Sequence, residues 1–425
     1  MTSHWITHDT KTYESNITAH NFFNMFKSLS LKVIIFGFIF TFFSSFGQSF
    51  FLGLFNSSIR DALSITQGQF GTIYASATLL SSFLLIWVGK KIDDINIFKF
   101  AFFVTILLSF SCFFFSKISS ITFLFIAIFL MRFSGQGMMS HTATTTISRY
   151  FTKSRGKALS TSWFGLSTAE FILPVLIVYL LTVTSWQNLW IYISILVLIF
   201  LPITSFILVR NLNFESREET NQNESNENIK QWKRIEVLKD YRFYIICLNM
   251  LAMPWIATGV FVYQSFITES KGWGTYVIAQ SFMVYSVLSV ITLLVAGFLI
   301  DKFTSRKLLI FMNIPLLIST IVLMYFDISF SAFLFLGLIG ISNGLANVLG
   351  SSTWAEIYGV RHIGSIKALT TALMVFSTAF GTALFGLLID TGFSIEQVAQ
   401  VSFVYIALAA VLLFFVRNKL NPQYL

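Results

Sequence analysis

Long apolar runs separated by short polar segments recur along the whole chain, and they predict membrane-spanning helices. A helix needs about 20 consecutive apolar residues to cross the hydrocarbon core of a bilayer. Some runs meet this length unaided, and others carry Gly, Ser or Asn but remain long enough to span. The predicted helices are 31–55, 66–89, 98–116, 120–147, 157–182, 186–209, 241–268, 275–300, 307–326, 330–356, 364–389 and 394–416.

These twelve helices divide into two groups of six, so the predicted fold class is an all-α membrane protein with two six-helix bundles. The N-terminal bundle covers 31–209 and the C-terminal bundle covers 241–416, with tails at 1–30 and 417–425. The linker 210–240 joins the bundles.

The linker has two parts of different composition. Its centre, 215–228, is rich in Glu, Asn and Ser and cannot bury enough apolar surface to order itself. The following stretch places Trp232, Ile235 and Leu238 three residues apart, with Lys and Arg between them. This spacing predicts a short amphipathic helix over 229–238 on the inner membrane surface, and a plain connecting segment is the alternative.

The chain repeats itself once. Residues 89–94 read GKKIDD and residues 297–302 read GFLIDK, so Gly, Ile and Asp recur after 208 positions. The same offset returns at Tyr150 and Tyr358. An internal repeat within the membrane predicts two pseudo-symmetric bundles, which is the usual plan of a transporter with a site between them.

Composition and charge agree with a membrane location. The chain is 55% hydrophobic and 11% charged, with 50 Phe, which exceeds what a soluble core of this length needs. Its net charge is +9, and 24 of its 28 Lys and Arg fall in loops and tails on one side. This positive-inside bias predicts cytoplasmic termini in a cell membrane and argues against a nucleic-acid partner.

Several other kinds of chemistry are not indicated. Cys112 and Cys247 lack the spacing of a metal site or a disulfide framework and are predicted to be small core residues. The chain has no nucleotide-binding loop, no Ser/His/Asp set and no metal cluster motif. We therefore expect neither an enzyme nor a cofactor, and we expect a monomer in the bilayer.

Two ionisable side chains fall near the middle of predicted helices. Arg132 lies eleven residues from the outer end of helix 4, and Glu170 lies thirteen residues from the inner end of helix 5. At about 1.5 Å per residue they reach similar depth. A charge at the bilayer centre costs about 2.5–3.5 kcal/mol on insertion scales, so both should face the interior. The pair is predicted to be a substrate or coupling site, and a purely structural ion pair is the alternative.

Polar side chains at helical spacing accompany these charges. Gln136 follows Arg132 by four residues, and Asn343 precedes Asn347 by four, so each pair shares a helix face. Gln48 and Gln264 sit in matching Gln-Ser-Phe segments of helices 1 and 7. We predict that these amides line the pathway; the alternative for each is a hydrogen bond between helices.

His141 lies nine residues after Arg132, toward the inner side. Because histidine titrates near neutral pH, it is a candidate proton relay. The alternative is a packed, hydrogen-bonded residue.

The chain resembles the major facilitator superfamily over nearly its whole length. The resemblance rests on the two Gly-x-x-x-Asp loops, the second of which continues as DKFTSRK over 301–307, and on the helix 4 segment RFSGQG at 132–137. The first loop departs from the pattern at Asp94 and Asn96, where a basic residue and Gly are usual. The segment 132–174 is most similar to bacterial members near the monocarboxylate-porter and oxalate–formate-exchanger branch.

The resemblance implies a pathway lined by helices 1, 4, 7 and 10. We further hypothesise that the two loops form a gate, because each Asp follows a Gly that permits a tight helix exit and each loop carries nearby cations. The predicted gating residues are Gly89, Asp93, Gly297, Asp301 and Arg306.

The expected function is secondary active transport of a small organic solute, an organic acid by branch analogy, by alternating access and with coupling to protons. Arg132 is the candidate anchor for the acid. Two alternatives stay open: a facilitator or exporter of a neutral or apolar solute, and a transporter-like sensor that does not translocate its ligand.

Overall fold

The computed structural model describes residues 29–151, 155–210, 212, 231–359 and 361–420. Within these residues the regular structure is helical, and twelve helical segments are long and apolar enough to cross a membrane. Helices suit this environment because they satisfy every backbone hydrogen-bonding group internally. The predicted all-α fold class is confirmed.

The first membrane span is broken into short pieces, which continue to Leu63, beyond the predicted end at 55. The fourth span contains a π-helical segment, η3. The N-terminal helices are α2 (Leu29–Ser44), η1 (Ser45–Gly47), α3 (Ser49–Leu52), η2 (Gly53–Phe55), α4 (Asn56–Leu63), α5 (Gln67–Lys90), α6 (Ile97–Phe115), α7 (Ile121–Met131), η3 (Arg132–Met139), α8 (Ser140–Tyr150), α9 (Arg155–Val183) and α10 (Trp186–Val209).

The C-terminal half follows the same plan, with breaks in its first and third spans. Its helices are α12 (Tyr241–Val262), α13 (Gln264–Ser270), α14 (Thr275–Phe303), α15 (Ser305–Leu308), η4 (Leu309–Phe311), α16 (Ile314–Tyr325), α17 (Phe330–Tyr358), α18 (Ile363–Asp390), α19 (Ile395–Val416) and η5 (Arg417–Leu420).

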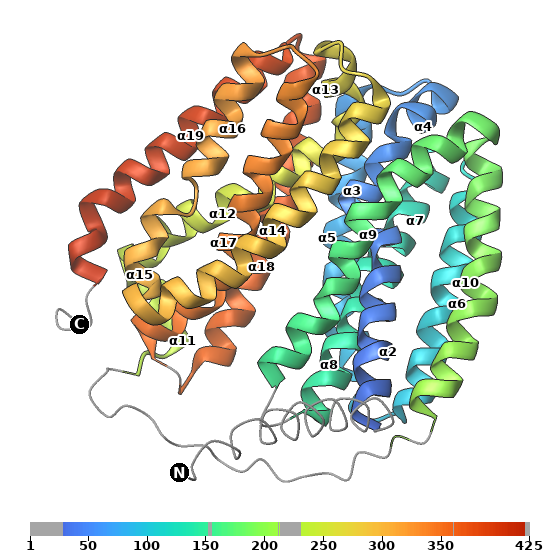
Figure 1. Ribbon diagram of the computed structural model, residues 1–425, viewed down its shortest axis with the longest axis horizontal. Helices are drawn as coiled ribbons and strands as arrows, with labels where there is room; N and C mark the ends of the chain where they lie inside the picture. The colour runs from blue at the N-terminus through green and yellow to red at the C-terminus, as the bar shows by residue number, and fades with distance from the viewer. Residues whose placement is uncertain (1–28, 152–154, 211, 213–230, 360, 421–425) are drawn as a thin grey trace, which may run out of the picture.

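The two bundles meet at one end and diverge at the other (Figure 1). They approach each other where α4 and α13 lie, which we call the outer face. They separate where α2 begins and α19 ends, which we call the inner face after the distribution of Lys and Arg. Across the seam α5 packs against α18, and α9 packs against α14. In the repeat, α5 corresponds to α14 and α9 corresponds to α18. The two contacts are therefore equivalent, as pseudo-symmetry requires.

Within the described part of the linker, the structure has one short helix, α11 (Arg234–Lys239), rather than the predicted helix over 229–238. It packs against the C-terminal bundle through Val237, which is fully buried, while Ile235 is 69% exposed. Trp232 lies outside the helix, and its backbone N–H donates to the Tyr358 carbonyl at 3.0 Å. The helix therefore packs through Val237 and not through the predicted apolar face, which included Ile235. Residues 229–230 and the segment 215–228 lie outside the described residues.

Candidate functional site

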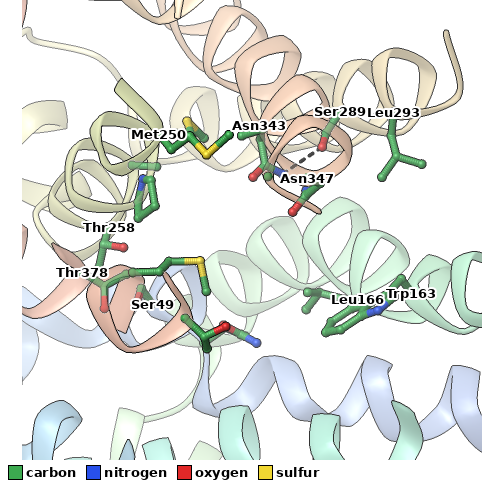
Figure 2. Close-up of a pocket in the computed structure, with 18 of the residues that line it drawn as sticks. Ser49, Trp163, Leu166, Met250, Thr258, Ser289, Leu293, Asn343, Asn347 and Thr378 are labelled. Carbon is green, nitrogen blue, oxygen red and sulfur yellow. Dashed lines mark hydrogen bonds between the residues drawn. The ribbon is translucent and has the colours of Figure 1, made fainter. Parts of the chain in front are cut away.

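A cavity of about 710 Å³ lies between the two bundles. It reaches the inner ends of three helices at Ser160, Trp354 and Lys367, so it opens toward the inner face. Figure 2 shows its two walls: Ser49, Trp163 and Leu166 from the N-terminal bundle face residues of the C-terminal bundle. The opposing residues include Asn343, Asn347, Ser289, Leu293 and Met250.

Close backbone packing places Arg132 in this cavity. Arg132 is the first residue of η3, where the fourth span crosses the break in the first span. A side chain at Gly47 would overlap the Met131 carbonyl and the Gln136 backbone N, so only glycine permits this crossing. π-Helical segments inside α-helical spans occur frequently at functional sites.

The Arg132 guanidinium is held by neutral groups. Nη1 donates to the Gly47 carbonyl at 3.1 Å and to Ser49 Oγ at 3.3 Å. The guanidinium carbon lies 5.4 Å from the centre of the Tyr74 ring, a cation–π contact. The side chain is only 2% exposed. None of these groups carries the negative charge that would neutralise a buried cation.

Glu170, on α9, lines the same cavity and is 9% exposed. Within the described residues, no ion pair within 4.0 Å joins it to Arg132. The direct pair that the sequence predicted is therefore not formed in this structure, because Arg132 turns to the polar backbone at the break in the first span. The two opposite charges face one cavity without contact.

Four of the five predicted amides also line the cavity: Gln48, Gln136, Asn343 and Asn347. The Asn343 amide donates to Ser289 Oγ at 2.9 Å, as Figure 2 shows. Gln264 is the exception. It is 3% exposed and is absent from the lining of this cavity.

Gln264 joins the two bundles instead. Its amide nitrogen donates to the Phe50 carbonyl at 2.9 Å and to the Phe261 carbonyl at 2.8 Å. Gln48 and Gln264 therefore have different surroundings, although both belong to Gln-Ser-Phe segments. Gln48 lies on extended backbone at the break in the first span, whereas Gln264 begins α13 at the outer side.

His141 lies on α8, where it contacts α5, and it is not among the residues that line the cavity. Its Nε2 atom is 3.0 Å from the Gly89 carbonyl. A Cβ atom at Gly89 would lie 3.3 Å from the same nitrogen, so the glycine lets the two helices approach. This contact fits the alternative of a packed, hydrogen-bonded histidine.

The proposed gating loops make contacts within their own bundles. Asp93 forms an ion pair with Arg149, which also donates to the Ile92 carbonyl at 3.0 Å. Arg306 forms an ion pair with Glu356 at 2.9 Å. The sequence interpretation missed both partners. A signal was present, because Arg149 directly precedes Tyr150, and Glu356 lies two residues before the matching Tyr358.

Asp301 is exposed at the inner end of α14, and a Cβ atom at Gly297 would meet open space. Within the described residues, no hydrogen bond or ion pair joins Asp301 to the N-terminal bundle. This arrangement fits a structure whose cavity is open at the inner face.

Comparison with known proteins agrees with this architecture. The fold is shared with a bacterial homologue of the human lysosomal transporter Spinster in its inward-facing, unoccupied conformation (13% identity, 93% of this chain and 98% of that chain, TM-score 0.69). It is also shared with the nucleoside transporter NupG (12% identity, 92% and 99%, TM-score 0.68). A search of curated proteins finds no match.

The sequence model of the Major Facilitator Superfamily matches residues 37–335 and, in a second match, residues 245–424. The second match covers the C-terminal bundle, in keeping with the internal repeat. The protein therefore belongs to the Major Facilitator Superfamily and is a membrane transporter.

Proposed function

We propose that this protein is a secondary transporter that moves a small organic acid by alternating access. The observation that carries the proposal is the buried guanidinium of Arg132, which lines the cavity between the bundles without an anionic partner among the described residues. A buried charge is costly unless it is paired. A substrate carboxylate would supply the missing charge and would fit the planar donor geometry of arginine.

Glu170 is the proposed proton site. Both side chains are buried, where water screens charge less than it does in solution, so the two charges interact even without contact. An anion bound at Arg132 cancels the positive potential that favours ionised Glu170, so substrate binding promotes proton uptake by the carboxylate. Substrate and proton then cross together, as symport requires.

We further propose a monomer in the cell membrane with both termini cytoplasmic. The excess of Lys and Arg on the inner face supports this orientation.

Apolar residues on the cavity wall support a second candidate, a facilitator or exporter of a neutral or apolar solute. Met250, Met253, Phe261, Leu293 and Leu294 all line the cavity. The two candidates differ in what they require of Arg132, because a neutral solute has no charge for it to neutralise.

A thermal-shift screen of the purified protein against small carboxylates, amino acids and sugars tests the proposed substrate class. A ligand that binds only the folded protein stabilises it by about 2.7 kcal/mol at 100 times its Kd. We expect carboxylates to raise the melting temperature and neutral sugars to leave it unchanged. Stabilisation by neutral compounds alone would favour the second candidate.

Cysteine labelling tests the proposed pathway. In a variant with Cys112 and Cys247 replaced by serine, cysteines at Gln48, Gln136, Asn343 and Asn347 should react with a small polar thiol reagent. Gln264→Cys is the matched control, because the amide is buried at the contact between the bundles and should react slowly. Failure of all four to label, under conditions that label an exposed loop cysteine, would contradict the pathway.

The gating proposal concerns the outward-facing state, in which we expect Asp93 and Asp301 to hold the inner ends of the bundles together. Asp301→Asn should slow transport without lowering protein abundance. The matched control is Asp94→Asn, because Asp94 is exposed and pairs with Lys91 at 3.7 Å within its own loop. Exposed ion pairs of this kind contribute little, about 0–1 kcal/mol. If Asp301→Asn transports as fast as the control Asp94→Asn, Asp301 is not part of the gate.

A further inference from the structure

At the outer face, the end of α18 contacts the start of α5. Asp390 is the last residue of α18, and one of its carboxylate oxygens accepts two hydrogen bonds from the other bundle. Thr66 Oγ1 donates at 2.5 Å, and the backbone N–H of Gly68 donates at 2.9 Å. A carboxylate at a helix N-terminus is stabilised by the unpaired N–H groups and by the helix dipole. We call this contact the outer contact.

Glycines allow the two helix backbones to approach this closely. A Cβ atom at Gly386 would lie 2.6 Å from the Gln67 carbonyl, and one at Gly68 would lie 2.5 Å from the Asp390 carboxylate. The Tyr263 hydroxyl fills the remaining space, 3.1 Å from the Gln67 carbonyl and 2.8 Å from the Thr382 carbonyl. Close packing of the two backbones therefore closes the seam between α5 and α18, in addition to the hydrogen bonds of the Asp390 carboxylate.

The end of α18 carries the same pattern as the two repeated loops. Residues 386–390 read GLLID, beside GKKID at 89–93 and GFLID at 297–301. The first two copies lie at the inner ends of α5 and α14, whereas the third ends α18 at the outer face.

The third copy lies on α18, at the seam with α5, and the related helix α9 does not carry the pattern. At the 210-residue offset that relates α9 to α18, Leu180 stands where α18 has Asp390. On the seam between α9 and α14, the bond between bundles runs from Ser286 Oγ to the Ser167 carbonyl, at 2.7 Å. Ser167 lines the cavity, whereas Asp390 lies at the outer end of its helix.

We propose that Asp390 is a gating residue of the transport cycle. It keeps the outer side closed while the cavity is open to the inner face, and it must leave Thr66 and Gly68 before the outer side can open. Alternating access requires α5 and α18 to separate at this end, and separation removes both donors from the carboxylate at once. The inference rests on membership of the transporter family and is independent of the substrate.

The rate at which a cysteine in the cavity is labelled from each face reports whether this gate is open or closed. Thr258 is 8% exposed, lines the cavity and lies near the outer end of α12. In a variant with Cys112 and Cys247 replaced by serine, Thr258→Cys is exposed to a membrane-impermeant maleimide, first from the outer face and then from the inner face in inverted vesicles. Asp390→Asn should raise the labelling rate from the outer face severalfold and lower it from the inner face.

Asp327→Asn is the matched control. Asp327 is also an exposed carboxylate at the outer side, but it pairs with Lys271 at 2.7 Å within the C-terminal bundle. Its replacement should leave both labelling rates unchanged. A second pair covers the case in which Asp390→Asn folds poorly: Thr66→Val removes the donor hydroxyl and should act like Asp390→Asn, whereas Thr66→Ser keeps the hydroxyl and should not.

Opposite changes at the two faces support the proposal, because a population shift opens one side as it closes the other. A parent-like labelling rate in both Asp390→Asn and Thr66→Val overturns it. Faster labelling from both faces also overturns it, because that result describes a loosened fold rather than a gate.

Discussion

Arg132→Ala is expected to weaken the binding of an organic anion strongly while the protein still reaches the membrane. Truncating one partner of a buried, hydrogen-bonded charge pair costs about 2–5 kcal/mol, and 1.4 kcal/mol is tenfold in affinity. The affinity should therefore fall by roughly 30-fold or more. Arg132 is the cation held at the break in the first span, by the Gly47 carbonyl and Ser49 Oγ. Binding of the purified variant to a carboxylate, by calorimetry or thermal shift, measures the loss.

The control for this prediction is Lys367→Ala. Lys367 lines the inner end of the same cavity but is exposed, so solvent screens its charge. It should change affinity much less than Arg132→Ala. Arg132→Lys should keep part of the binding, because it retains the charge but loses the planar fork of donors. Wild-type affinity in Arg132→Ala would remove Arg132 from the site and would favour a neutral substrate.

Glu170→Gln is expected to keep binding and exchange of substrate but to lose accumulation driven by a proton gradient. The amide imitates the protonated carboxyl, so the variant carries the neutral form throughout the cycle. Counterflow, in which labelled substrate exchanges for unlabelled substrate, should continue in proteoliposomes. Accumulation in response to an imposed pH gradient should disappear.

A purely structural role for the two charges gives a different result. A direct ion pair would tolerate the exchanged double variant, Arg132→Glu with Glu170→Arg. Arg132 instead donates to the Gly47 carbonyl and Ser49 Oγ, and a carboxylate at position 132 cannot donate to that carbonyl, so we expect the variant to lose binding. Glu396→Gln is a suitable control for Glu170→Gln, because Glu396 pairs with Lys271 at 2.7 Å at the outer side of the C-terminal bundle. Accumulation that persists in Glu170→Gln would remove Glu170 from proton coupling.

The helices and their division into two bundles could be predicted because the signals are local. A run such as 98–116 is long enough to span the bilayer by itself, and the structure places α6 at Ile97–Phe115. The polar linker and the repeated motif likewise separate the halves without any knowledge of packing. Arg132 and Glu170 stand out because charges are rare in the middle of such runs, and both line the cavity.

The contacts of these residues could not be predicted, because they depend on packing between distant segments. Arg132 binds the backbone at Gly47, 85 residues earlier, at a break in the first span that the apolar pattern does not reveal. Gln264 matches Gln48 in sequence but joins the two bundles. The contact between Thr66 and Asp390 joins residues 324 positions apart. The GLLID pattern at 386–390 is present in the sequence, but it does not reveal this partner.

Uptake of radiolabelled lactate, succinate and oxalate into proteoliposomes tests the central claim most directly. We predict that at least one of these acids accumulates above its equilibrium level when a proton gradient is imposed. Accumulation should be absent without the gradient and absent in Arg132→Ala. If none of the acids accumulates, and a neutral solute enters equally well through the wild type and Arg132→Ala, the protein is not a proton-coupled transporter of these acids.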